Sequence, residues 1–283
     1  MGSNQILKAP QGQIFAIRTW GDPAALPVIA LHGWLDNAAS FDVLAPLLTD
    51  VYLVAIDLPG HGLSSHRSHD GAYYIWSYLD DVRWVAGQLG LTRFSLLGHS
   101  MGGAIACLLS ALFPDRVRQL LLLDAIGPLA TRASDAPSQM RKALRQQQGV
   151  QARKPNIYAS ELDAVTARSR KGISRDAARM LASRGLSKTS GGYYWHMDQR
   201  LRNANLLSLT EEQVACFMRQ IQCPSLLVSA AASWQQERQS LFRLRQSYID
   251  GLETVELDGN HHQHMEAQAP AVAVLLNAFL HRF

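Results

Sequence analysis

The stretch with the clearest chemical potential lies near residue 100, where a serine stands between two glycines. Residues 94–106 read FSLLGHSMGGAIA, so the pattern Gly-x-Ser-x-Gly is centred on Ser100. A strand-type apolar run precedes this centre, and a helix-type run follows it. In that context the pattern predicts a sharp strand-to-helix turn that exposes the Ser100 hydroxyl for nucleophilic attack. Gly98 and Gly102 lack a Cβ and would let the strand and the helix approach closely.

A serine nucleophile also needs donors for the negative charge that develops on the attacked carbonyl oxygen. The backbone amide of Met101 begins the predicted helix, whose positive N-terminus favours such a charge. A second candidate donor is the amide of Trp34, which follows a strand-type run that ends in His32 and Gly33. Both amides are therefore candidates for an oxyanion hole.

Three histidines near the C-terminus offer a general base. Residues 258–266 read DGNHHQHME and follow the last strand-type run. Histidine is well suited to take a serine proton near neutral pH. A zinc site is the alternative, but zinc needs ligands that converge in space, and a His-His-x-His run on a loop spreads its side chains apart. We expect no metal and no cofactor.

The elements that must position these residues follow from the apolar periodicity. Strands are predicted at 13–20, 28–31, 51–56, 94–98, 117–123, 225–228 and 254–257, and helices at 41–48, 75–89, 104–113 and 267–283. Strands that alternate with helices predict an α/β fold with a mostly parallel central sheet and helices on both faces. Ligands bind at the carboxyl ends of such strands, where we expect Trp34, Asp57, Ser100 and Asp124.

Residues 127–222 differ in character from the rest of the chain. They carry 16 Lys or Arg against 7 Asp or Glu, a net charge of +9, while the remainder has a net charge of −5. Helices are predicted at 140–148, 176–184 and 211–220, with an extended piece at 191–198. We interpret 127–222 as a helical cap inserted into a core formed by 1–126 and 223–283. The basic cap predicts either solvated helix faces or attraction of anionic substrates.

Composition narrows the class of protein further. The chain has 283 residues and three cysteines, an odd number without metal-type spacing, which favours free thiols in a reducing compartment. The first residues lack the basic-then-apolar pattern of a signal peptide, and no apolar run is suited to cross a membrane. No nucleic-acid-binding module is recognisable. We expect a cytoplasmic protein with a small-molecule substrate and neither nucleic-acid nor membrane partners; the oligomeric state stays open.

The order of these motifs resembles the α/β-hydrolase fold superfamily over residues 13–126 and 223–283. Four stretches are similar to the serine hydrolase-like proteins: 32–37 (HGWLDN), 57–64 (DLPGHGLS), 198–201 (DQRL) and 259–261 (GNH). The resemblance implies Ser100 as the nucleophile and His261 as the base. It also implies the amides of Trp34 and Met101 as the oxyanion hole.

The acid of the expected triad departs from the superfamily pattern. The superfamily usually takes it from the loop after the strand at 225–228, but here residues 229–234 read SAAASW, with Ser233 in place of the aspartate. Asp124, at the end of the preceding strand, is the favoured substitute, as in some superfamily members. Glu237 is the alternative.

These residues predict a serine-dependent hydrolase that acts on a carboxylic ester through an acyl-enzyme. Other reactions on the same site are alternatives, namely C–C bond hydrolysis, perhydrolysis and cyanohydrin cleavage. A ligand-binding pseudoenzyme is a third possibility, favoured only by the missing acid near Ser233. The presence of Ser100 and His261 favours an enzyme.

Overall fold

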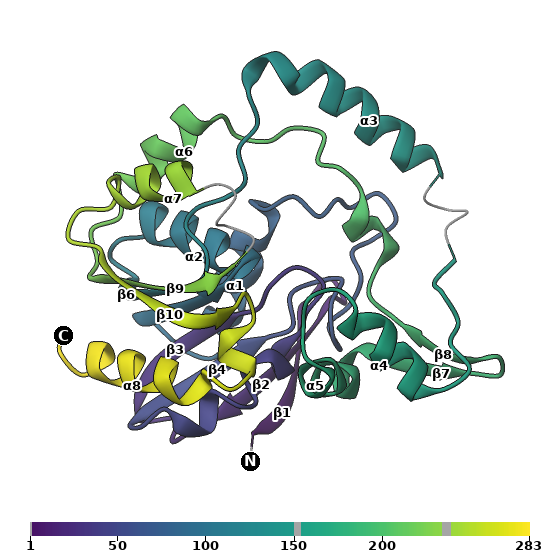
Figure 1. The fold of residues 1–283 in the computed structure, drawn as a ribbon, viewed down its shortest axis with the longest axis horizontal. Helices are drawn as coiled ribbons and strands as arrows, with labels where there is room; N and C mark the ends of the chain where they lie inside the picture. The colour runs from purple at the N-terminus through teal and green to yellow at the C-terminus, as the bar shows by residue number, and fades with distance from the viewer. Residues whose placement is uncertain (1, 150–153, 234–238) are drawn as a thin grey trace.

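The computed structural model describes residues 2–149, 154–233 and 239–283, and an eight-stranded sheet forms its centre (Figure 1). The strands are β1 (Ser3–Lys8), β2 (Ile14–Trp20), β3 (Leu26–Leu31), β4 (Val51–Ile56), β5 (Phe94–His99), β6 (Val117–Leu123), β9 (Ser225–Ala232) and β10 (Glu253–Asn260). Their order is β1-β2-β4-β3-β5-β6-β9-β10. The β1–β2 and β2–β4 pairs are antiparallel, and the other pairs are parallel. The predicted α/β class with a mostly parallel sheet is confirmed.

Helices cover both faces of this sheet. The α-helices are α1 (Ser77–Gln88), α2 (Met101–Leu112), α3 (Ala136–Gly149), α4 (Glu161–Ser169), α5 (Arg175–Gly185), α6 (Glu211–Met218), α7 (Gln239–Gln246) and α8 (Ala269–Leu280). Side chains alternate between the faces of a strand. Leu96 and Leu122 therefore pack in one core cluster with α1, α2 and α6, whereas Leu97 and Leu121 pack in a second cluster with α8.

The predicted helix at 41–48 is wrong. Two short 3-10 helices occupy this region, η1 (Ala38–Phe41) and η2 (Ala45–Leu47). The Asn37 side chain accepts a hydrogen bond from the amide of Ala39 and so fixes the start of η1. Pro46 has no N–H to donate and disfavours helical geometry at the residue before it, which explains why no continuous α-helix forms here.

The segment 127–222 holds α3 to α6 and a hairpin of β7 (Leu186–Thr189) and β8 (Gly192–Trp195). Figure 1 shows α3 set apart from the sheet, while α4 and α5 lie beside the hairpin. A third apolar cluster joins α4 and α5 to Met265 of the core. In contrast, Val214 and Met218 of α6 pack in the core cluster beside α2. The boundaries of core and cap stay a prediction.

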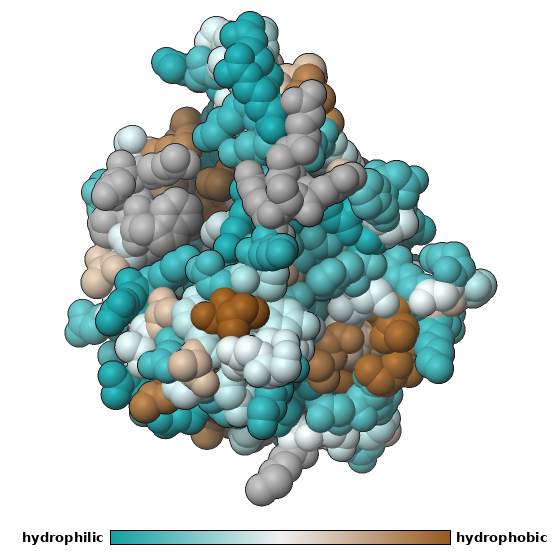
Figure 2. Space-filling model, turned by 90° about the vertical axis from the view of Figure 1, so that its right-hand side faces the viewer, coloured by the Kyte–Doolittle hydropathy of each residue, from teal (hydrophilic) through white to brown (hydrophobic). Residues whose placement is uncertain are grey.

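The outer face of this segment is mostly polar. Figure 2 shows a largely hydrophilic surface in which the hydrophobic colour is confined to small separate patches. Among the described residues, no helix is long and apolar enough to cross a membrane.

Candidate active site

Ser100 stands at a strained turn between β5 and α2. Its φ of 51° and ψ of −115° lie outside the regions that non-glycine residues favour. The backbone N–H of Ser100 donates to the Leu123 carbonyl at 3.2 Å, which ties the turn to the end of β6. The strained conformation is the geometry expected of a nucleophile elbow.

The glycines around this turn are required by close packing. A Cβ on Gly98 would lie 2.5 Å from the Cα of Gly103, and a Cβ on Gly102 would lie 2.0 Å from the Leu31 carbonyl oxygen. A Cβ on Gly103 would lie 2.7 Å from the Cβ of Ala125. The Gly-x-Ser-x-Gly pattern predicts the need for the first two glycines but not for Gly103. Strand and helix approach at distances that larger residues would prevent.

Asp124 and His261 meet at the carboxyl ends of β6 and β10. The Nδ1 atom of His261 lies 2.5 Å from Asp124 Oδ2, and the Asp124 carboxylate is almost fully buried. Asp124 itself has a φ of 46°, a left-handed conformation that aspartate adopts more readily than most residues. The structure therefore brings together the histidine and the acid favoured from the sequence.

Ser233 has a role that the sequence analysis did not anticipate. Its hydroxyl donates to Asp124 Oδ2, and the backbone N–H of Ala230 donates to Asp124 Oδ1 at 3.1 Å. Ser233, at the usual acid position, thus hydrogen-bonds to the acid favoured from the sequence. Glu237, the alternative acid, lies outside the described residues.

The two candidate oxyanion donors line the same pocket as Ser100 and His261. Met101 is the first residue of α2, so its N–H has no acceptor within the helix. Among the described residues, neither the Trp34 nor the Met101 backbone N–H donates to a protein acceptor. Trp34 is half exposed, and its indole N–H donates to the Leu201 carbonyl of the cap at 3.0 Å.

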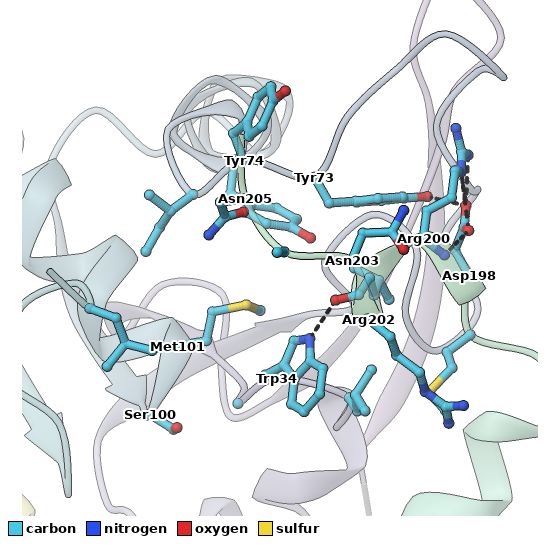
Figure 3. A pocket seen from close by; sticks show the side chains of 18 of the residues that line it. Trp34, Tyr73, Tyr74, Ser100, Met101, Asp198, Arg200, Arg202, Asn203 and Asn205 are labelled. Carbon is cyan, nitrogen blue, oxygen red and sulfur yellow. Dashed lines mark hydrogen bonds and ion pairs between the residues drawn. The ribbon is translucent and has the colours of Figure 1, made fainter. Parts of the chain in front are cut away.

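The pocket is large and runs from the elbow to the cap. It has a volume of about 1600 Å³. In Figure 3 it extends from Ser100 and Met101 past Trp34 and Tyr74 to Asp198 and Arg200. The wall of the pocket along this path combines aromatic rings with polar side chains. A pocket of this size and lining can hold an organic molecule.

Arg200 shapes the far end of this pocket. Its guanidinium pairs with Asp198 at 2.6 Å and also donates to the carbonyl oxygens of residues 67, 68, 69 and 71. The Tyr73 hydroxyl donates to the same Asp198 carboxylate at 2.7 Å. The stretch 198–201, noted above for its resemblance, thus anchors the loop that borders the pocket.

Buried ion pairs fasten the cap to the core. Arg184 of α5 donates to the fully buried Asp57 at 2.7 Å, and Arg168 of α4 donates to Asp36 at 2.6 Å. Burial alone would raise the pKa of Asp36, but the nearby His262 and the charge of Arg168 lower it well below its usual range. The Asp36 carboxylate is therefore held as an anion beneath α4.

The three histidines near the C-terminus have separate partners in the structure. Among the described ranges, no group of three His, Cys, Asp or Glu side chains is arranged to hold a metal ion. His262 lies 3.6 Å from Asp36, and the buried His264 packs 4.3 Å, centroid to centroid, from His99. Burial lowers the pKa of His264 to about 3 and that of His99 well below its usual value, so both rings are neutral near pH 7.

The chain matches a known protein family over most of its length. Residues 27–268 match the model of the alpha/beta hydrolase fold, and the chain belongs to this family. The chain is 34% identical to a serine hydrolase-like protein of Danio rerio, over 97% of this chain and 87% of the relative. It is also 34% identical to serine hydrolase-like protein 2 of Homo sapiens, over 97% of this chain and 92% of that one. The predicted resemblance is confirmed, and these relatives support a hydrolase.

Solved structures are similar over nearly the whole chain. A hypothetical protein from Pseudomonas aeruginosa PAO1 is 40% identical, with a TM-score of 0.94 and 99% of each chain covered. A thioesterase domain from the curacin biosynthetic pathway is 25% identical, with a TM-score of 0.86, and 98% of this chain and 99% of that chain are covered. The fold of the core and cap is thus one that other chains share.

Proposed function

We propose that this protein is a serine-dependent hydrolase that cleaves a carboxylic ester or a related acyl substrate through an acyl-enzyme. The observation that carries the proposal is the Asp124–His261 pair at 2.5 Å, whose histidine lines the same pocket as the strained Ser100. The proposed roles are those of a triad in which Asp124 orients the base.

In the first half of the reaction, the Ser100 Oγ attacks the acyl carbon while His261 Nε2 accepts the hydroxyl proton. The carbonyl π bond opens, and its electron pair becomes an oxyanion stabilised by the amides of Trp34 and Met101. Asp124 accepts the hydrogen bond from His261 Nδ1–H, which leaves Nε2 as the proton acceptor. His261 then returns the proton to the leaving alcohol as the C–O bond breaks.

In the second half, water attacks the Ser100 acyl ester. His261 takes a proton from the water and gives it back to Ser100 Oγ when the new tetrahedral intermediate collapses. The products are the free carboxylic acid and the regenerated serine. The reaction needs neither a cofactor nor an oxidant, because every proton and electron pair is supplied by the substrate, the water and the triad.

A panel of acyl substrates tests this proposal. Activated esters of increasing acyl length, with matched thioesters, are assayed with the wild-type chain and with Ser100→Ala. We expect turnover by the wild type and a loss of at least about 10³-fold in the variant. Wild-type turnover that survives in Ser100→Ala would reject the nucleophile. Thioesters belong in the panel because of the likeness to a thioesterase domain.

The main competing functions are other reactions at the same site and ligand binding without catalysis. C–C bond hydrolysis, perhydrolysis and cyanohydrin cleavage would use the same residues on different substrates. The contact of Asp124 with His261 favours an enzyme over a pseudoenzyme, because Asp124 takes the place of the missing loop acid and is itself held by Ser233 and Ala230.

A further inference from the structure

His99, which directly precedes Ser100, joins the elbow to the loop that carries His261. His99 is fully buried at the end of β5. Its Nε2 atom lies 2.9 Å from the backbone carbonyl oxygen of His261. A carbonyl oxygen only accepts hydrogen bonds, so Nε2 must carry the proton. The bond therefore fixes the tautomer of His99 and links the candidate base to the strand of the candidate nucleophile.

The other edge of the His99 ring is confined by packing, and its unprotonated Nδ1 makes no hydrogen bond within the described part of the chain. Nδ1 lies 3.7 Å from Asp36 Oδ2, and Asp36 is held in turn by Arg168. A Cβ on Gly33 would lie 2.8 Å from His99 Nδ1, so the chain passes this edge at close range. The ring centroid of His99 also lies 4.6 Å from that of His261. In this packing the His99 ring lies with Nε2 aimed at the His261 carbonyl.

The base needs support at its backbone as well as at its ring. Asp124 fixes Nδ1 of His261, but one hydrogen bond to a ring atom leaves the ring free to swing about that contact. A fixed carbonyl on the same residue holds the backbone from which the ring extends and so limits this freedom. Displacement of a catalytic group by about 1 Å costs on the order of 10²-fold in rate. The His99 bond is placed to prevent such a displacement.

We propose that His99 is a positioning residue, which holds His261 in register with Ser100 through the Nε2–H bond to the His261 carbonyl. The inference rests on the proposed function and assigns His99 no contact with the substrate. A merely structural role predicts a different pattern, in which any substitution that fills the same volume preserves the rate.

Two substitutions at His99 separate these roles. Gln places an amide N–H close to the position of Nε2 and keeps the donor, whereas Leu fills the space and removes it. Gln119 offers a matched control: it is also fully buried, and its Nε2 donates to the carbonyls of Phe279 and Leu280 away from the pocket. Gln119→Leu therefore removes a buried donor to backbone carbonyls without touching the site.

We expect His99→Leu to lower kcat by roughly 10- to 100-fold with little change in KM, and His99→Gln to recover most of this loss. Gln119→Leu should lower the melting temperature but leave kcat within about threefold of wild type. A second readout is the downfield NMR resonance of His261 Nδ1–H, which should weaken in His99→Leu and persist in His99→Gln.

Equal losses in His99→Leu and His99→Gln, or a wild-type kcat in His99→Leu, would overturn the inference. Failure of the proposed function looks different, because the wild type itself would then show no turnover. In that case the His261 resonance still decides whether His99 holds the base: an unchanged signal in His99→Leu would overturn the inference independently.

Discussion

Replacement of Asp124 by Asn removes one charge from the candidate triad while keeping the size of the side chain. In the structure, Oδ1 of Asp124 accepts from the Ala230 N–H, and Oδ2 faces His261 Nδ1 and the Ser233 hydroxyl. An asparagine has only one oxygen, and the Ala230 N–H can only donate. The amide oxygen therefore stays at the Oδ1 position, and the NH₂ group faces His261.

The size of the effect follows from this geometry. An NH₂ group facing Nδ1 makes that atom an acceptor, which moves the proton of His261 to Nε2, where it blocks proton transfer from Ser100. The corresponding change in a serine protease triad costs about 10⁴-fold in kcat. An asparagine turned so that its oxygen faces His261 would keep the correct tautomer but leave the Ala230 N–H unpaired. That orientation costs about 1–3 kcal/mol, which corresponds to a roughly 10- to 100-fold loss in kcat. We therefore expect a loss between about 10-fold, if the asparagine flips, and about 10⁴-fold, if it does not.

The assay compares Asp124→Asn with Glu237→Gln, since Glu237 is the other acid near the usual loop. Initial rates on an activated ester give kcat and KM, and circular dichroism checks that both variants fold. Glu237→Gln should stay within about tenfold of wild type. If Glu237→Gln loses most of its kcat and Asp124→Asn does not, the assignment of the acid is wrong.

The remaining predictions concern stability and charge. Arg184→Met should lower the free energy of unfolding by about 3–5 kcal/mol in urea titrations, because it removes the partner of the buried Asp57 carboxylate. Arg179→Met breaks only an exposed ion pair and should lower the free energy of unfolding by less than about 1 kcal/mol. The pKa of His264 is lowered to about 3 in the fold, so the unfolded chain binds the extra proton between about pH 6.5 and 3 and wild-type stability falls as pH drops through that window. The free energy of unfolding of His264→Leu should therefore rise relative to that of wild type by up to about 1.4 kcal/mol for each pH unit lost in this window. A difference that does not change with pH would contradict this. The basic segment 127–222 should favour an anionic ester over a neutral ester of equal size at low salt. If the ratio of the two kcat/KM values does not change with salt, electrostatic attraction of the substrate is rejected.

Much of the fold could be predicted because its signals are local. The buried strands β3, β4, β5 and β6 read as short apolar runs, and the elbow at Ser100 combines a motif with a strand before it and a helix after it. The helix α4 was not predicted. A capping box of Ser160 and Asp163 fixes its start, and only two of its residues are buried, so it leaves little apolar periodicity to detect.

The support around the site could not be predicted, because it depends on residues far apart in the chain. Asp36 meets Arg168 across 132 positions, and His99 meets the His261 carbonyl across 162. No sequence motif relates residues at such separations. Ser233 was noticed only as a missing acid, since a serine beside Ala residues carries no sign that its hydroxyl will reach Asp124. Packing of the cap and the loops against the sheet decides these contacts.

Covalent labelling tests the central claim most directly. The wild-type chain and Ser100→Ala are treated with a fluorophosphonate, and the modified residue is located by peptide mass spectrometry. We expect one phosphonyl group on Ser100 in the wild type, slower labelling in Asp124→Asn, and no label in Ser100→Ala. A wild-type chain that folds but takes no label at Ser100, or takes it at another residue, would contradict a serine hydrolase built on this elbow.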